Sequence, residues 1–224
     1  MRETLPRLAL SSGSTEALKW LALVLMTLDH VNTFLYDGKF PVLFKLGRMA
    51  MPIFGFVLAC NLARREAVET GAYQRTMKRL ALYGLLASPV FVALVGWWPL
   101  NIMFTLLLAA AVMYLMEKAG RGHVIAALLL LAAGGAIVEF KWFGLLYCLA
   151  AWWYCKDPDW PRLILWTASA ASLYAINHNL WTVAALPVIF AVDRLRIRVP
   201  RLRHIFYVYY PAHLAVLWAL PNSF

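Results

Sequence analysis

The sequence predicts an all-α fold, a polytopic bundle of about nine transmembrane helices with a cytoplasmic N-terminus and an outside C-terminus. Three observations predict it. Of the 224 residues, 63% are hydrophobic and 14% charged, whereas globular domains are about half apolar and about a quarter charged. The apolar residues form long unbroken runs, such as AALLLLAA at 126–133, and a helix that is apolar all round is typical of a membrane span. Lysine and arginine are also unevenly distributed along the chain.

Nine apolar segments approach the length of a membrane span, which is about 20 residues. Several of these segments are shorter than a full span, so their boundaries are approximate. No linker, low-complexity tract or internal repeat divides the chain, so a single transmembrane domain is expected over residues 1–224. The expected helices are 17–36, 41–62, 77–95, 99–116, 123–138, 140–155, 163–176, 180–192 and 205–220.

The cationic residues support this count independently. They gather at the N-terminus and in the connections after the second, fourth, sixth and eighth segments. Of the 21 lysines and arginines, all but four fall on that side, and the four are Lys39, Lys45, Arg48 and Lys141. Cytoplasmic loops are enriched in lysine and arginine, which gives the orientation stated above. The same bias accounts for the formal net charge of +10, so membrane lipids are expected partners and nucleic acid is not.

Polar residues within or next to the spans fall from the bilayer centre outward. Asp29 and His30 lie roughly 20 Å along the first helix, in its outer half. Ionisable groups are costly in a bilayer and are therefore candidates for function. The full set is Asp29, His30, Arg48, Asn101, Glu139, Lys141, His178 and His213.

Asp29, Arg48 and Asn101 also have structural interpretations. Asp29 and Arg48 are typical of a buried ion pair that joins two helices. Because adjacent helical residues point about 100° apart, Asp29 and His30 do not form a direct dyad, and His30 is left to face the bundle centre. Asn101 stands at a helix start and is typical of an N-cap.

The remaining polar residues have structural interpretations as well. His213 follows Pro211, and its ring is suited to capping backbone freed by a proline kink. Glu139 and Lys141 fit interfacial charges, and His178 fits a turn. The five histidines show no H-x-x-x-H or HExxH spacing, so no metal site is expected. Aromatic residues of the last helix are typical of an interfacial belt, namely Tyr207, Tyr209 and Tyr210.

Four motifs, in order along the chain, resemble the TraX family of conjugation-associated membrane proteins. They are ALKWLALVLMTLDHVNTFLY (17–36), LGRMAMPIFGFVLACNLARR (46–65), NIMFTLLL (101–108) and YPAHL (210–214). The most specific parts are LDHxNT and GRMAxPIF, and the similarity runs from about residue 17 to 218. The resemblance implies an acetyltransferase of the bacterial inner membrane, which moves acetyl from cytoplasmic acetyl-CoA, as donor substrate, to the N-terminal amine of a pilin subunit.

The resemblance also implies where the site lies, because the motifs contain Asp29, His30, Arg48, Asn101 and His213. His30 is expected to act as the general base, since an imidazole titrates near neutrality. His213 is expected to orient that base or to relay a proton or the acetyl group. Arg48 or Asn101 is expected to stabilise the thioester oxyanion. Glu139 completes the set of candidate catalytic residues.

The donor arrives from the cytoplasm, so its nucleotide is expected on the basic loops. One candidate patch holds five cations from the connection after the second helix and the start of the third, and a second candidate spans 194–203. For each residue alone, the alternative of a purely topogenic charge stays open. The first patch is Arg64, Arg65, Arg75, Lys78 and Arg79.

Two other classes of function stay open from the sequence. A non-catalytic pilin chaperone or assembly factor needs a groove for a hydrophobic helix but no buried histidines. An O-acyltransferase acting on a glycan or lipid needs the same base for a hydroxyl acceptor. A transporter is disfavoured, because it is expected to show two symmetric halves with interrupted helices.

Overall fold

The computed structural model describes residues 8, 10–195, 199–200, 202 and 204–220. Within these ranges the secondary structure is helical, with one isolated backbone bridge between Leu100 and Val138. The expected all-α fold is confirmed. The helices are α1 (Ser12–Leu35), α2 (Pro41–Gly47), α3 (Ala50–Leu62), α4 (Ala72–Val95), α5 (Ile102–Lys118), α6 (Arg121–Ile137), α7 (Lys141–Lys156), α8 (Trp160–Ser172), α9 (Tyr174–Asn177), α10 (Ala185–Arg194) and α11 (Ile205–Ala219).

The second expected helix, 41–62, is broken between α2 and α3 at Arg48 and Met49. The physical reason is Pro52. A continuous helix needs a hydrogen bond from the N–H of residue 52 to the carbonyl of Arg48, but proline has no N–H and its ring clashes with that carbonyl. The backbone instead forms a turn at Arg48 and Met49, and the Arg48 N–H donates to the carbonyls of Phe44 and Lys45 at 3.3 and 3.2 Å.

The expected helices 163–176 and 180–192 also differ from the structure. The first divides into α8 and α9, and the second begins only at Ala185. Ser169 and Ser172 donate their hydroxyls to the carbonyls three residues back, which competes with regular helix at the end of α8. With 13 and 10 residues, α8 and α10 rise only about 20 and 15 Å. The span count and the orientation stay predictions.

Two helical segments of the described chain are long and apolar enough to cross a membrane, residues 41–62 and 72–95. The helices Arg121–Ile137 and Ile205–Ala219 are apolar but shorter. Large apolar side chains are widely exposed along these elements: Leu85 on α4 is 63% exposed, Leu129 on α6 is 66% exposed and Val216 on α11 is 58% exposed. Exposed apolar surface of this extent marks a face that contacts lipid or another protein.

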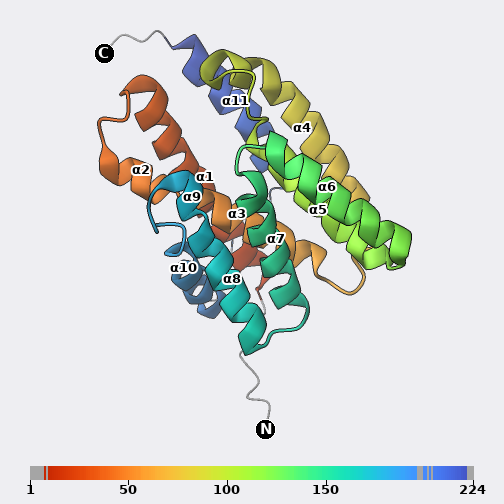
Figure 1. The fold of residues 1–224 in the computed structure, drawn as a ribbon. Coiled ribbons are helices and arrows are strands. Elements are labelled where there is room, and N and C mark those ends of the chain that lie inside the picture. Colours follow the sequence, from red (N-terminus) through yellow and green to blue (C-terminus); the bar gives the residue numbers. More distant parts are fainter. Residues whose placement is uncertain (1–7, 9, 196–198, 201, 203, 221–224) are drawn as a thin grey trace.

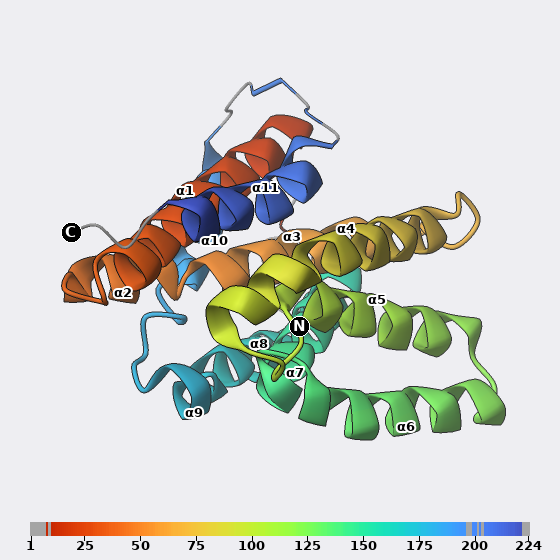
Figure 2. The same cartoon turned by 90° about the horizontal axis from the view of Figure 1, so that it is seen from above.

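Helix α3 lies in the middle of the arrangement, with α1 packed on one side and α7 on the other (Figure 2). Helices α4 and α11 run side by side, as do α5 and α6 (Figure 1). The C-terminal ends of α1 and α11 lie at the same end of the bundle (Figure 1). The Leu100–Val138 bridge joins the α4–α5 connection to the α6–α7 connection. These contacts bring α1, α3, α4, α5 and α11 around a shared interior.

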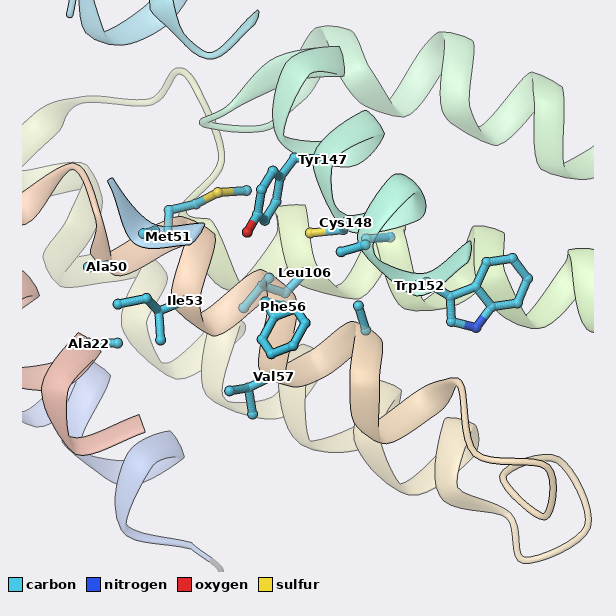
Figure 3. Close-up of a cluster of buried hydrophobic side chains, with 14 of the residues drawn as sticks. Ala22, Ala50, Met51, Ile53, Phe56, Val57, Leu106, Tyr147, Cys148 and Trp152 are labelled. Atoms are coloured by element: carbon cyan, nitrogen blue, oxygen red, sulfur yellow. The ribbon is translucent and has the colours of Figure 1, made fainter. Parts of the chain in front are cut away.

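The core is built where α3 crosses α7. Side chains of Phe56 and Ile53 on α3 pack near Tyr147 and Cys148 on α7 (Figure 3). The Tyr147 hydroxyl donates to the Pro52 carbonyl at 2.9 Å. Gly55 allows the close approach, because a Cβ at this position would lie 2.9 Å from the Cys148 sulfur.

Replacing Gly55 by leucine is therefore expected to destabilise the α3–α7 crossing. Overpacking a core costs about 1–3 kcal/mol, and 1 kcal/mol corresponds to about 2–4 °C in a chain of this size. The apparent melting temperature of the purified protein in detergent should fall by at least about 2 °C. Gly122→Leu is the matched control, since a Cβ there meets nothing within 4 Å. Equal effects of the two substitutions would contradict this account of the crossing.

Candidate active site

A cavity of about 200 Å³ lies between α1, α3, α4, α5 and α11. On α1 its lining extends from Lys19 to His30, which is about 16 Å along the helix axis. On α3 it extends from Ala50 to Leu62, the full length of the helix. The cavity thus follows the interior of the bundle rather than forming a local depression at one surface.

The two ends of the cavity differ in chemistry. At one end, which we call the basic end, the lining includes Lys19, Asn61, Thr76 and Tyr207. At the other, which we call the histidine end, it includes Asp29, His30, Arg48 and Glu139. Apolar side chains such as Phe54, Val57 and Leu106 line the stretch between them. Four of the candidate catalytic residues from the sequence therefore share one end of one cavity.

Asp29 and Arg48 form the expected ion pair at the histidine end, between Oδ2 and Nη2. Asp29 is 4% exposed, and its second oxygen, Oδ1, is buried without a partner among the described residues. Gly47 makes the approach of α2 to α1 possible, because a Cβ there would fall 2.6 Å from the Asp29 Cγ. The ion pair therefore depends on glycine immediately before the arginine.

Arg48 has two further contacts. Its Nη1 donates to the Asn177 Oδ1 at 3.4 Å, and its guanidinium carbon lies 4.4 Å from the centre of the Phe44 ring. The Arg48 Nε is buried and has no partner within the described residues. The neighbouring His178, a candidate from the sequence, is exposed in a left-handed turn. Asn177, 4% exposed, was missed because it lies in a polar tripeptide with the exposed His178 and the half-buried Asn179.

His30 and His213 form a direct pair, although 183 residues separate them. The His30 Nδ1 lies 2.7 Å from the His213 Nε2, and the two rings are nearly parallel at an angle of 9°. His213 is 7% exposed and lies behind His30, which lines the cavity. The packing of α1 against α11 brings the two residues together.

Hydrogen bonding assigns the protons of this pair. The His213 Nδ1 lies 3.0 Å from the Tyr209 carbonyl oxygen, which only accepts, so this nitrogen carries the proton. A neutral His213 then accepts at Nε2, and the His30 Nδ1 is the donor. The His30 Nε2 consequently holds a lone pair, as a general base requires.

Tyr209 supports the histidine pair through its ring as well. The ring stacks on His213 with centroids 5.1 Å apart, and its hydroxyl is 2.8 Å from the Thr27 Oγ1. The neighbouring Tyr210 is 3% exposed and lines the cavity, as does Tyr207. The aromatic-belt interpretation is wrong for Tyr210. The sequence spacing could have indicated this position. Tyr209 and Tyr210 lie one helical turn before His213, so they share a face of the helix with that candidate residue.

Asn101 acts structurally in this arrangement. Its Oδ1 accepts from the Met103 N–H at 3.1 Å, which makes it the N-cap of α5. Its Nδ2 donates to the Gly84 carbonyl at 3.0 Å and lies 3.3 Å from the Ser88 hydroxyl. The amide therefore joins α4 to α5, and the catalytic part expected of Asn101 stays a prediction.

Glu139 lies in the connection between α6 and α7, outside both helices. The Leu100–Val138 bridge holds it in place, and its own N–H donates to the Leu100 carbonyl at 2.9 Å. Its Oε2 is buried and has no hydrogen-bond partner in the described part of the chain. Burial raises the pKa of Glu139 to about 7, an effect that the Arg48 guanidinium and the Ile102 backbone N–H oppose.

None of the five residues of the expected nucleotide patch lines the cavity. Arg64, Arg65 and Lys78 are exposed, and so is Arg75, whose Nη1 donates to the Thr70 carbonyl. Arg79 is half-buried, and its guanidinium lies 5.9 Å from the ring centre of Tyr207, a lining residue of the basic end.

The basic end holds one cation that the sequence analysis did not select. Lys19 lines the cavity, and its Nζ pairs with the Glu16 carboxylate at 2.5 Å. In the second candidate patch, Arg196, Arg198, Arg201 and Arg203 lie outside the described residues. Lys141 is exposed with a positive φ at the start of α7. No group of three histidine, cysteine or carboxylate residues able to hold a metal ion occurs in the described ranges.

Comparison with known proteins gives one consistent result. The family model described as TraX protein matches residues 14–221. A Protein TraX of Escherichia coli is 30% identical over 223 residues, which cover 94% of this chain and 88% of that protein. A Protein TraX of Escherichia coli strain K12 is 30% identical over 173 residues, which cover 75% and 67%. No solved structure matches the chain. The chain belongs to the TraX family, as its motifs predicted.

Proposed function

We propose that this protein is a multi-pass acetyltransferase of the bacterial inner membrane that functions in conjugation. It moves the acetyl group of cytoplasmic acetyl-CoA to the N-terminal amine of a conjugative pilin subunit. Membership of the TraX family and the exposed apolar surfaces of α4, α6 and α11 support this proposal. In the proposed orientation the basic end faces the cytoplasm and the histidine end faces outward.

One observation carries the proposal: a single cavity joins the basic end to a paired histidine. The donor has a charged nucleotide, a long narrow arm and a reactive thioester at its tip. Lys19 and Arg79 would contact the phosphates, and the apolar stretch would hold the arm. The thioester would then lie beside His30, on the side of the bundle opposite the cytoplasmic pool.

The transfer itself follows from the proton assignment. The His30 Nε2 takes a proton from the attacking amine, the nitrogen forms a bond to the acetyl carbon, and the carbon–sulfur bond breaks. The thiolate of the departing CoA receives the proton from His30. His213 holds the His30 Nδ1–H throughout, which keeps the lone pair directed at the substrate. His213 is thus a positioning residue in this proposal.

Arg48 is suited to stabilise the oxyanion that forms as the amine attacks. Its Nε is a buried donor without a partner among the described residues, and the residue lines the cavity beside His30. Removing one such donor costs about 3 kcal/mol in enzymes where it has been measured. We do not assign oxyanion stabilisation to Asn101, because its amide bonds to the backbone of α4 and α5. Asp29 orients Arg48 through the ion pair.

Intact-mass analysis of co-expressed pilin tests the proposal. Wild-type protein should add one acetyl group to the pilin, and His30→Ala should reduce the acetylated fraction sharply, since a general base contributes about 10²–10⁴-fold. His178→Ala, which changes an exposed histidine, should leave the fraction unchanged. An unmodified pilin with wild-type protein would count against this acceptor, and acetylation of a co-purified glycan or lipid would then favour O-acyl transfer.

The basic end gives a second, separate test with purified protein. Lys19→Ala and Arg79→Ala should each raise the KM for acetyl-CoA several-fold with little change in kcat, because the lost contacts are to the distant phosphates. The effect should weaken at high salt. Arg121→Ala is the control, since Arg121 is exposed at the start of α6 and does not line the cavity. A lower kcat with unchanged KM in the first two variants would contradict the assignment of the donor to this end.

A further inference from the structure

Glu139 is the charged group of the cavity that the proposed reaction has not used. The histidine end is lined by two carboxylates, Asp29 and Glu139, and by one guanidinium, Arg48. The ion pair with Asp29 engages Arg48. The Glu139 Oε2 remains buried without a hydrogen-bond partner in the described part of the chain. This end therefore carries an acidic group in excess of its cations.

We infer that the carboxylate of Glu139 binds the α-ammonium group of the acceptor, and so makes the histidine end select amines over hydroxyls. This inference rests on the proposed acetyl transfer and assigns its acceptor subsite. An ammonium ion entering this end supplies the missing positive charge and donates to the Oε2 atom. A neutral hydroxyl supplies no charge, and so leaves the buried carboxylate uncompensated.

Proton accounting supports the same assignment. An alkylammonium acceptor must lose two protons to become an amide, whereas a hydroxyl acceptor loses one to become an ester. Of the two protons, one passes through His30 to the thiolate of CoA, as described above. The other leaves when the ammonium becomes an amine, before the carbon–nitrogen bond forms, and Glu139 is placed to receive it and to release it outward. The cavity thus has two proton acceptors, His30 and Glu139, for the two protons that an ammonium acceptor must lose.

The surroundings of Glu139 fit a binding group rather than a simple surface charge. The Leu100–Val138 bridge fixes its backbone, and the next residue, Phe140, also lines the cavity. Asp29, Arg48 and Tyr210 are the charged and titratable neighbours that act on it from other elements. The N-terminal turn of α5 contributes the Ile102 N–H. Arg48, the cation in this set, is shared with Asp29.

Binding of a matched pair of peptides tests the inference directly. One is an alanine-initiated decapeptide with a free N-terminal amine, and the other carries lactate in place of that alanine, so that a hydroxyl replaces the ammonium. Affinities are measured by calorimetry on the full-length protein in detergent. Wild type should bind the amine peptide at least 10-fold more tightly, and Glu139→Gln should reduce this preference to less than 2-fold.

Two further variants control for folding and charge. Glu139→Asp keeps the carboxylate and should retain most of the preference. Glu117→Gln removes a carboxylate that pairs with Lys156 at 2.5 Å, away from the cavity lining, and should leave the preference intact. The inference is overturned if wild type binds both peptides equally or binds neither. It is also overturned if Glu139→Gln weakens the two peptides by the same factor, because a structural role has that effect.

Transfer assays with the same peptides separate this inference from the proposed function. Acetyl transfer by wild type without any preference for the amine peptide supports acetyl transfer and overturns the role of Glu139. A preference in binding without any transfer from acetyl-CoA overturns the proposed reaction and leaves Glu139 as an amine-binding group.

Discussion

Arg48 lies at the break between α2 and α3, inside a largely apolar bundle, and its positive charge must be balanced by a neighbouring group. Losing one partner of a buried ion pair costs about 3–5 kcal/mol. Pro52 causes the break, Gly47 admits the close approach, and Asp29 supplies the carboxylate that holds Arg48. The pair fixes α1 relative to α2 and α3. His30 follows Asp29 on α1, and adjacent helical side chains point about 100° apart. While Asp29 faces Arg48, the side chain of His30 therefore faces His213.

The cavity that results has different charged groups at its two ends. One end has Lys19, which pairs with Glu16, and Arg79, which lies beside the lining residue Tyr207. In the proposed function these cations contact an anionic donor, and the Glu139 carboxylate at the other end, whose Oε2 has no hydrogen-bond partner among the described residues, contacts a cationic acceptor. The histidine pair stands at the second end, where donor tip and acceptor would meet. In the proposed function, the donor enters at the basic end and the acceptor enters at the histidine end.

Much of the fold was predictable because apolar runs and cationic loops are local signals. The site was predictable in part. Asp29 and Arg48 stand in neighbouring segments, and their pairing follows from charge burial. The pairing of His30 with His213 was not predictable from spacing, because the contact depends on how α11 packs beside α1 and α4. The position of Glu139 depends on a backbone bridge between two connections, for which the sequence carries no pattern. The helix break was missed although Pro52, four residues after Arg48, signals it.

In the proposed function, the acetyl group passes through the bundle from one membrane face to the other. Proteoliposomes with the protein in a single orientation test it most directly, with acetyl-CoA supplied to one face and an amine peptide to the other. Acetylation is expected when acetyl-CoA is on the face of the basic end and the peptide is on the opposite face. Acetylation only when both substrates are on the same face would contradict it.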